Sequence, residues 1–256
     1  MIDAAPTLLG IFAHPDDESL ACGGLFARAA ARGARVILVS LTRGEAGPAP
    51  AGTAAPLGEV RAAEFQAAAR LLGAHVAIVR DHADGMLPWI DPAVLDADVT
   101  GLLDAWQPDV VITFDSDGLY WHPDHIAVHA RTTAAVTARG ERAPALYYVS
   151  MPRGQMRAVA ARTATGAAVV PGLDEPDAFG AEAPAPTLTI DAGPAAPVKL
   201  AAIQCHASQF GATAFAALTA EDAGLIAVEH YRRAAVGAPG PTFLDRLGTP
   251  STGLVA

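Results

Sequence analysis

The sequence lacks the features that mark several large classes of protein. Its 256 residues include only two cysteines, Cys22 and Cys205, which could form one bridge but which we expect to stay reduced. Basic residues number 17 against 27 acidic ones, and the net charge of -10 leaves no concentrated basic face to bind nucleic acid. No apolar run approaches the roughly 20 residues that a membrane helix requires. The composition therefore predicts a protein that acts on neither nucleic acid nor membrane.

Signals for export and for nucleotide binding are also lacking. Asp3 stands where a cleavable export signal would carry basic residues, so we expect a cytoplasmic protein. Gly23 and Gly24 have no phosphate-loop lysine and no G-x-G-x-x-G pattern beside them, which favours close helix packing over nucleotide binding. In contrast, 52% of the residues are hydrophobic, enough for a sizeable core. We predict a single domain over residues 1–256.

Short apolar runs alternate with alanine-rich helical patterns along most of the chain. Strands are predicted at 7–13, 35–41, 75–79, 109–114, 145–150 and 187–191. Helices are predicted at 18–32, 58–72, 92–106, 123–138, 197–210 and 219–235. Such alternation indicates an α/β fold, with a mostly parallel sheet covered by helices on both faces. The Pro/Ala-rich segment 164–186 has neither periodicity and is predicted to be a loop or lid.

Two clusters of polar residues follow predicted strands. The sequence HPDDE at 14–18 comes after the first strand, and YWHPDH at 120–125 comes after the fourth. In a doubly wound sheet these two strands are often neighbours beside the point where strand order reverses, so the clusters should converge. His14, Asp17 and one histidine of the second cluster would then leave a tetrahedral zinc ion one open position for water. A carboxylate beside that water could act as general base.

Each cluster also has a simpler interpretation. Asp16, Asp17 and Glu18 could merely complement the helix dipole in a first helical turn. His125 and His129 stand four residues apart on one helical face and offer a rival metal pair. The residues alone leave these alternatives open.

The two clusters together resemble a known family of enzymes. AHPDDE at 13–18 with HPDH at 122–125 is similar to the PIG-L/LmbE-like zinc-dependent N-deacetylases, which include N-acetylglucosaminyl-inositol deacetylases and natural-product sugar deacetylases. Further matches are TRGEAG at 42–47, VRAAEFQAAARLLG at 60–73, DG at 84–85, KLAAIQCHASQF at 199–210 and EHY at 229–231. The resemblance implies a Rossmann-like fold and a substrate of the N-acetylglucosamine-conjugate type. Segment 164–186 is unmatched.

The resemblance also implies roles for the residues of both clusters. His14, Asp17 and His125 would hold zinc, and His129 would then lie in the surroundings of the site. Asp16 would be the general base that takes a proton from the attacking water. Zinc would polarise the acetamide carbonyl and lower the pKa of the water, although Fe²⁺ or Co²⁺ would suit the same ligands.

Several more residues match family positions around the reacting group. His122 would act as an acid or stabilise the oxyanion, and Tyr120 would help to polarise the carbonyl. The positions that resemble sugar-contacting or site-shaping residues are Glu45, Arg61 and Asp84. Asp81 could take the place of Asp84, because the register of that stretch is ambiguous. Trp121 departs from the pattern of the sugar-inositol enzymes; we expect it at the mouth of the site, in contact with the substrate, with a core tryptophan as the alternative.

The sequence is compatible with three alternative functions. The first is hydrolysis of the amide of an N-acetylglucosamine-type sugar conjugate, a small-molecule partner. The second is hydrolysis of a thiol S-conjugate by an amidase of the same family. The third is a metal-binding protein without catalysis, which would lack Asp16 or His122; both are present. A homo-oligomer is compatible with all three.

Overall fold

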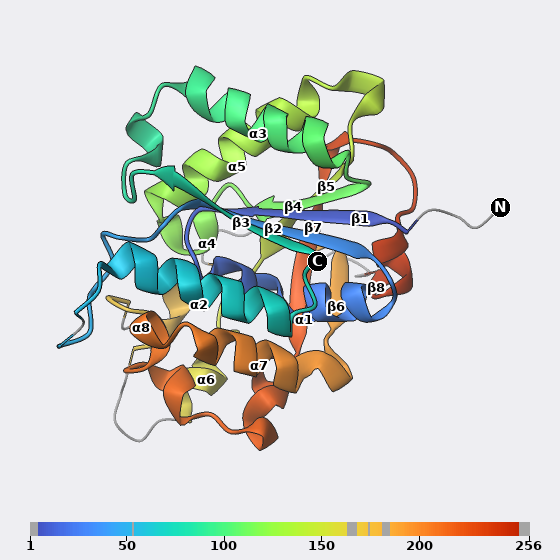
Figure 1. Ribbon diagram of the computed structural model, residues 1–256. Helices are drawn as coiled ribbons and strands as arrows, with labels where there is room; N and C mark the ends of the chain where they lie inside the picture. The colour runs from blue at the N-terminus through green and yellow to red at the C-terminus, as the bar shows by residue number, and fades with distance from the viewer. Residues whose placement is uncertain (1–4, 53, 163–167, 174, 181–184, 251–256) are drawn as a thin grey trace.

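The computed structural model describes residues 5–52, 54–162, 168–173, 175–180 and 185–250. Its centre is an eight-stranded sheet with the order β3-β2-β1-β4-β5-β7-β6-β8 (Figure 1). The strands are β1 (Thr7–Phe12), β2 (Arg35–Thr42), β3 (Val76–His82), β4 (Val110–Phe114), β5 (Ala145–Ser150), β6 (Leu188–Asp191), β7 (Val228–Gly237) and β8 (Thr249–Pro250). Strands β1 to β5 pair in parallel, whereas β7 runs antiparallel to both of its neighbours. The predicted mostly parallel α/β fold is confirmed.

Helices cover both faces of this sheet. They are α1 (Asp17–Ala31), α2 (Leu57–Leu71), α3 (Pro92–Trp106), α4 (Gly118–Trp121), α5 (Pro123–Thr137), α6 (Arg157–Ala161), α7 (Ala196–Cys205) and α8 (Ala207–Phe210). Helices α3 and α5 lie on one face, and α1, α2 and α7 lie on the other (Figure 1). Among the described residues, no helix combines the length and the apolar character that crossing a membrane requires.

The first half of the chain matches the sequence pattern closely. Four predicted helices, from 18–32 to 123–138, correspond to α1, α2, α3 and α5 within one residue at each end. All six residues of β1 are buried, as expected of a central parallel strand. Gly10 permits this packing, because a Cβ there would stand 2.7 Å from the ring of Phe26 on α1.

The second half of the chain contains two corrections. The predicted helix 219–235 is wrong: a 3₁₀ turn at Ala220–Ile226 precedes β7, which inserts between β5 and β6. The first half of β7 alternates as a strand should, with Glu229 and Tyr231 buried between less buried neighbours. The predicted helix 197–210 is broken at His206, which separates α7 from α8.

The strand order reverses between β1 and β4. Both strands run parallel and pair directly, through contacts such as Leu8 with Val110. The chain continues from β1 outward to β2 and β3, and from β4 outward to β5. Ligands bind at this kind of reversal, beyond the carboxyl ends of the strands, because the loops diverge there and leave a crevice. The predicted convergence of the two polar clusters follows from this pairing.

Candidate active site

The two clusters meet at the carboxyl ends of β1 and β4. His14 follows β1 and Asp17 opens α1, while His125 lies in the first turn of α5. Proline at the first position of α5 suits a helix start, since its missing N–H has no partner there in any helix. The backbone N–H of His14 donates to Asp17 Oδ2 over 2.8 Å, which fixes this carboxylate beside the imidazole.

Three side chains present atoms with the spacing of a metal site. His14 Nδ1 lies 3.2 Å from His125 Nε2 and 3.4 Å from Asp17 Oδ2, and His125 Nε2 lies 3.2 Å from Asp17 Oδ1. A tetrahedral zinc ion with bonds of about 2.0–2.1 Å needs ligand atoms about 3.3 Å apart. All three residues are buried. Two imidazoles and a carboxylate with this geometry fit a divalent metal such as zinc.

The other nitrogen of each imidazole also has a partner. His14 Nε2 lies 3.0 Å from Asp84 Oδ1 and 3.2 Å from Asp124 Oδ2, and His125 Nδ1 lies 3.1 Å from the carbonyl of Gly118. Partners of this kind fix the tautomer and orientation of a metal-binding histidine. Asp124 lies within HPDH but was not predicted, although its place between two site histidines was a usable signal.

The structure resolves two alternatives that the residues left open. His129 Nδ1 lies 3.0 Å from the carbonyl of Phe114, whereas His125 Nε2 faces His14 and Asp17, so the contacts favour His14 over His129 as the partner of His125. Asp84 faces His14, whereas Asp81 is an exposed residue that pairs with Arg43 over 2.5 Å. The interpretation of the DG stretch as Asp84 is therefore the one that the geometry supports.

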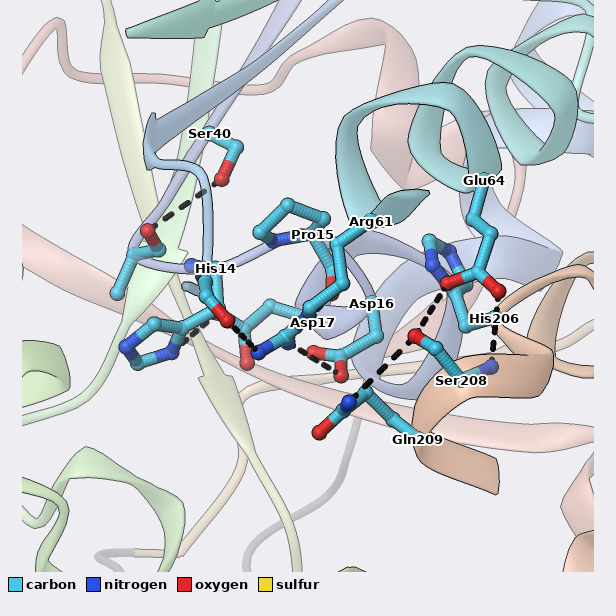
Figure 2. Close-up of polar contacts among 12 residues, drawn as sticks. His14, Pro15, Asp16, Asp17, Ser40, Arg61, Glu64, His206, Ser208 and Gln209 are labelled. Atoms are coloured by element: carbon cyan, nitrogen blue, oxygen red, sulfur yellow. Dashed lines mark hydrogen bonds and ion pairs between the residues drawn. The ribbon is translucent and has the colours of Figure 1, made fainter. Parts of the chain in front are cut away.

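Asp16 has an unusual backbone and a side chain turned toward the cavity. Its φ of 128° and ψ of -27° lie outside the regions that non-glycine residues favour, a conformation that costs of order 1–3 kcal/mol. Although it precedes α1, its carboxylate does not cap the helix. Arg61 Nη2 donates instead to Asp16 Oδ2 over 2.9 Å and to the carbonyl of Pro15 over the same distance (Figure 2). Burial raises the pKa of Asp16 to about 6, against the opposing charge of Arg61.

His122 and Tyr120 flank the metal-site residues on the side of α4 and α5. The backbone N–H of Asp124 donates to His122 Nδ1 over 3.3 Å, so this nitrogen is unprotonated and Nε2 carries the hydrogen. Burial and the neighbouring imidazoles lower the pKa of His122 to about 4. The Tyr120 ring packs edge-on against Phe179 and His125, with centroids 5.1 and 5.4 Å away.

These residues line a cavity of about 420 Å³, a volume typical of a small-molecule site. Its polar side holds His14, Asp16, Asp17, Arg61, Asp84, Tyr120, His122 and Gln209. Its apolar wall comes from Leu20, Pro48, Val170, Pro171, Leu173 and Phe210. The wall includes part of segment 164–186, although residues 164–167, 174 and 181–184 lie outside the described residues. The cavity therefore joins a polar reacting side to an apolar side.

Two predicted substrate-binding residues lie outside this lining. Glu45 Oε1 accepts a hydrogen bond from the backbone N–H of Asp84 over 2.9 Å, a contact that shapes the site. Trp121 has a left-handed φ of 65° and is 54% exposed, so the alternative of a core tryptophan is wrong. Arg61 lines the cavity, but its two terminal nitrogens already donate to Gly44, Pro15 and Asp16.

A second buried pair below the cavity was not predicted. Glu18 and His206 are fully buried, and Glu18 Oε1 lies 2.8 Å from His206 Nε2. Burial alone would lower the pKa of His206, but the adjoining charge of Glu18 raises it above its ordinary value. Both residues fall in stretches that match the family, yet a contact across 188 positions leaves no periodic signal in the sequence.

Fold and site together define an α/β protein with a cluster of potential metal ligands at the reversal of strand order. Residues 9–136 match the family model described as "PIG-L: GlcNAc-PI de-N-acetylase". A 1D-myo-inositol 2-acetamido-2-deoxy-alpha-D-glucopyranoside deacetylase of Mycobacterium sp. (strain KMS) is 34% identical over 94% of this chain and 87% of its own. The chain belongs to the PIG-L family. This confirms the predicted resemblance and the predicted enzyme class, an N-deacetylase.

Solved structures support the fold. N,N'-diacetylchitobiose deacetylase from Pyrococcus horikoshii superposes with a TM-score of 0.64 at 22% identity, covering 90% of this chain and 84% of its own. The 4-carboxy-2-hydroxymuconate hydratase GalB from Pseudomonas putida KT2440 superposes with a TM-score of 0.62 at 18% identity, covering 93% and 99%. Because a hydratase shares this architecture, the fold alone does not decide the reaction.

Proposed function

We propose that the chain is a metal-dependent hydrolase that removes the acetyl group from the nitrogen of an N-acetylglucosamine-type sugar conjugate. The observation that carries the proposal is the meeting of His14, Asp17 and His125 beside Asp16, in a cavity of small-molecule size. The name of the relative that is 34% identical describes a deacetylase of an acetamido sugar, which supports the same reaction for this chain. Zinc is the metal that we propose, and Fe²⁺ and Co²⁺ remain compatible with the ligand set.

Hydrolysis of an acetamide requires an activated nucleophile, a polarised carbonyl and a proton for the departing amine. A bound divalent metal supplies Lewis-acid chemistry, polarising the carbonyl and lowering the pKa of water. Asp16 lines the cavity and takes the proton of the attacking water. Arg61 and the turn before α1 hold the Asp16 carboxylate in place for this transfer.

The opposite wall stabilises the charge that develops on the carbonyl oxygen. His122 Nδ1 accepts from the backbone of Asp124, which leaves Nε2–H free to donate toward the cavity. A neutral imidazole in this tautomer is suited to donate a hydrogen bond to an oxyanion. The hydroxyl of Tyr120, in the same lining, is a second donor. Asp16 then returns its proton to the leaving amine.

The substrate assignment rests on the two sides of the cavity. Asp84 provides a polar contact suited to sugar hydroxyls, while Val170, Leu173 and Phe210 form an apolar surface for the acceptor group. An amidase acting on a thiol S-conjugate would use the same metal and the same base. The two functions therefore share the reacting residues and differ in the acyl group that is released from the amide.

The test measures acetate and free amine released from a panel of N-acetylglucosamine conjugates and thiol S-conjugates. Protein depleted of metal by a chelator should lose turnover, and stoichiometric zinc should restore it. Asp16→Asn keeps the size of the side chain and serves as the inactive, metal-binding control. Turnover of S-conjugates alone would favour the amidase. Stoichiometric metal without hydrolysis of either group would favour a non-catalytic metal-binding protein.

A further inference from the structure

The Glu18–His206 pair reaches the residue proposed as general base through its backbone. Glu18 is the second residue of α1, and both of its carboxylate oxygens have partners. Oε1 lies 2.8 Å from His206 Nε2 and accepts a hydrogen bond from the Ser19 hydroxyl over 2.6 Å. Oε2 accepts from the backbone N–H of Asp16 over 3.0 Å. The carboxylate is therefore fixed at one oxygen and fixes Asp16 with the other.

This contact acts on a strained part of the chain. Asp16 has a φ of 128°, and a residue in that conformation persists only where its surroundings hold it. The residue before a helix ordinarily uses its side chain for capping, and Glu at the third helical position can reach back to its N–H. Here Glu18, at the second position, makes the backward contact while the Asp16 carboxylate is turned to Arg61.

His206 holds Glu18 from a separate element of the fold. It lies at the break between α7 and α8, where its φ of -82° and ψ of 53° interrupt the helical path. Directly after the break, Ser208 donates to Glu64 from its N–H and its hydroxyl over 2.8 and 2.6 Å (Figure 2). The break therefore places a fully buried imidazole under the start of α1 and ties it to α2.

We propose that Glu18 is a positioning residue for Asp16, and that His206 holds Glu18 in the orientation this requires. Asp16 is then held at two points, its N–H by Glu18 and its carboxylate by Arg61. Loss of either contact lets the strained turn relax and moves the carboxylate away from the attacking water. This inference rests on the proposed function, which makes Asp16 the general base.

Three variants of the zinc-loaded protein test it. Glu18→Ala removes the acceptor for the Asp16 N–H, and we expect kcat to fall about 10- to 100-fold with KM within a factor of about three and unchanged zinc content. Glu18→Gln keeps an acceptor oxygen and should restore most of kcat. If Glu18→Ala does not fold, Glu18→Asp replaces it. Its side chain is too short to reach both partners, so we expect the same loss of kcat.

A double-mutant cycle separates positioning from a purely structural role. In an Asp16→Ala background, Glu18→Ala should cause no further loss of kcat, because the residue it positions is gone. A further loss of the same size as in the unmodified protein would overturn the inference. Glu229→Gln alters a buried carboxylate that contacts the same helix at Gly24 and Leu25, so it should lower the melting temperature without changing kcat.

Amide hydrogen exchange at Asp16, read by nuclear magnetic resonance, does not depend on turnover. We expect the Asp16 N–H to exchange at least tenfold faster in Glu18→Ala, and at the unmodified rate in Glu229→Gln. Unchanged exchange at Asp16 in Glu18→Ala would overturn the inference even if deacetylation is confirmed. If the unmodified protein hydrolyses no substrate but the exchange rates respond as expected, the result counts against the proposed function. The contact between Glu18 and the Asp16 backbone would still be established.

Discussion

Two buried acid–base pairs tie helix α1 to the C-terminal half of the chain, and they end in different places. Glu18–His206 lies at the start of α1, and the second carboxylate oxygen of Glu18 accepts from the backbone N–H of Asp16 at the cavity. Lys199–Glu229 lies further along α1, with Nζ 2.8 Å from Oε1. Both pairs are almost completely shielded from solvent, and both bind backbone N–H groups of the α1 region.

The second pair ends in the core. Glu229 accepts from Gly24 N–H, Leu25 N–H and the Tyr231 hydroxyl over 2.7 to 2.8 Å, so its charge is compensated on all sides. A Cβ at Gly24 would stand 2.4 Å from the Cβ of Ala192, which confirms close helix packing as the role of this glycine. Two buried carboxylates, one paired with an imidazole and the other with an ammonium group, thus have different consequences. Their role depends on what the outer oxygen contacts, rather than on the buried charge.

The largest effect on turnover should come from Asp16, whose N–H donates to Glu18 of the first pair. Asp16→Ala removes the proposed general base, and turnover should fall by about 10²- to 10⁴-fold while zinc stays bound. Asp17→Ala removes a proposed ligand, so zinc affinity itself should fall. The metal content after dialysis and the kcat of the two variants distinguish the role of Asp16 from that of Asp17. Equal metal loss in both variants would contradict the separation of their roles.

The second pair should show the opposite pattern. Lys199→Met removes the buried ammonium and leaves the Glu229 carboxylate with three neutral donors. Breaking a buried pair commonly costs 3–5 kcal/mol, and the remaining donors place our expectation near 3 kcal/mol. Urea unfolding would measure this, and kcat at a temperature where the variant stays folded should change less than threefold. A tenfold loss of kcat without destabilisation would show that this pair also affects the catalytic residues.

The sequence predicts one half of the molecule much better than the other, for a physical reason. From residue 7 to residue 150, each strand is a short, mostly apolar run and each helix has its own start and stop signals, so local periodicity decides both. Strand β7 is different, because Arg232 and Arg233 interrupt its apolar pattern and its alanines favour a helix. It becomes a strand because β5 and β6 pair with it from either side, which no local pattern records.

The candidate site shows the same division. His14, Asp17, Asp16 and His125 are predictable, since two motifs follow two strands that a doubly wound sheet brings together. The partners that orient them were not predicted. Asp124 contacts His14 from α5, across 110 positions of the sequence, and the Glu18–His206 pair depends on how α7 breaks at His206. The residue roles, the single domain and the oligomeric state remain predictions for experiment.

The pH dependence of stability distinguishes the two pairs further, with a smaller expected effect. The pKa of His206 is raised by the charge of Glu18, with contributions from Asp16 and Glu64. A group whose folded pKa lies above its unfolded value stabilises the protein fully below about 6.5, and this contribution is lost as pH rises through the folded pKa. The free energy of unfolding should therefore decline more steeply, as pH rises above about 6.5, in the unmodified protein than in His206→Gln. Parallel curves would contradict a protonated His206.

The smallest effect is expected at Trp121, which belongs to neither pair. Its side chain is 54% exposed and its left-handed φ of 65° suits glycine, so Trp121→Gly should change the free energy of unfolding by less than about 0.5 kcal/mol. An aromatic face between Tyr120 and His122 can still pack against a bulky acceptor beyond the cavity lining. We therefore expect kcat/KM to fall several-fold for a bulky or aromatic conjugate and to stay unchanged for a minimal N-acetylglucosamine, with zinc content constant. Equal losses on both substrates would show that Trp121 supports the turn that carries His122, and has no part in substrate selection.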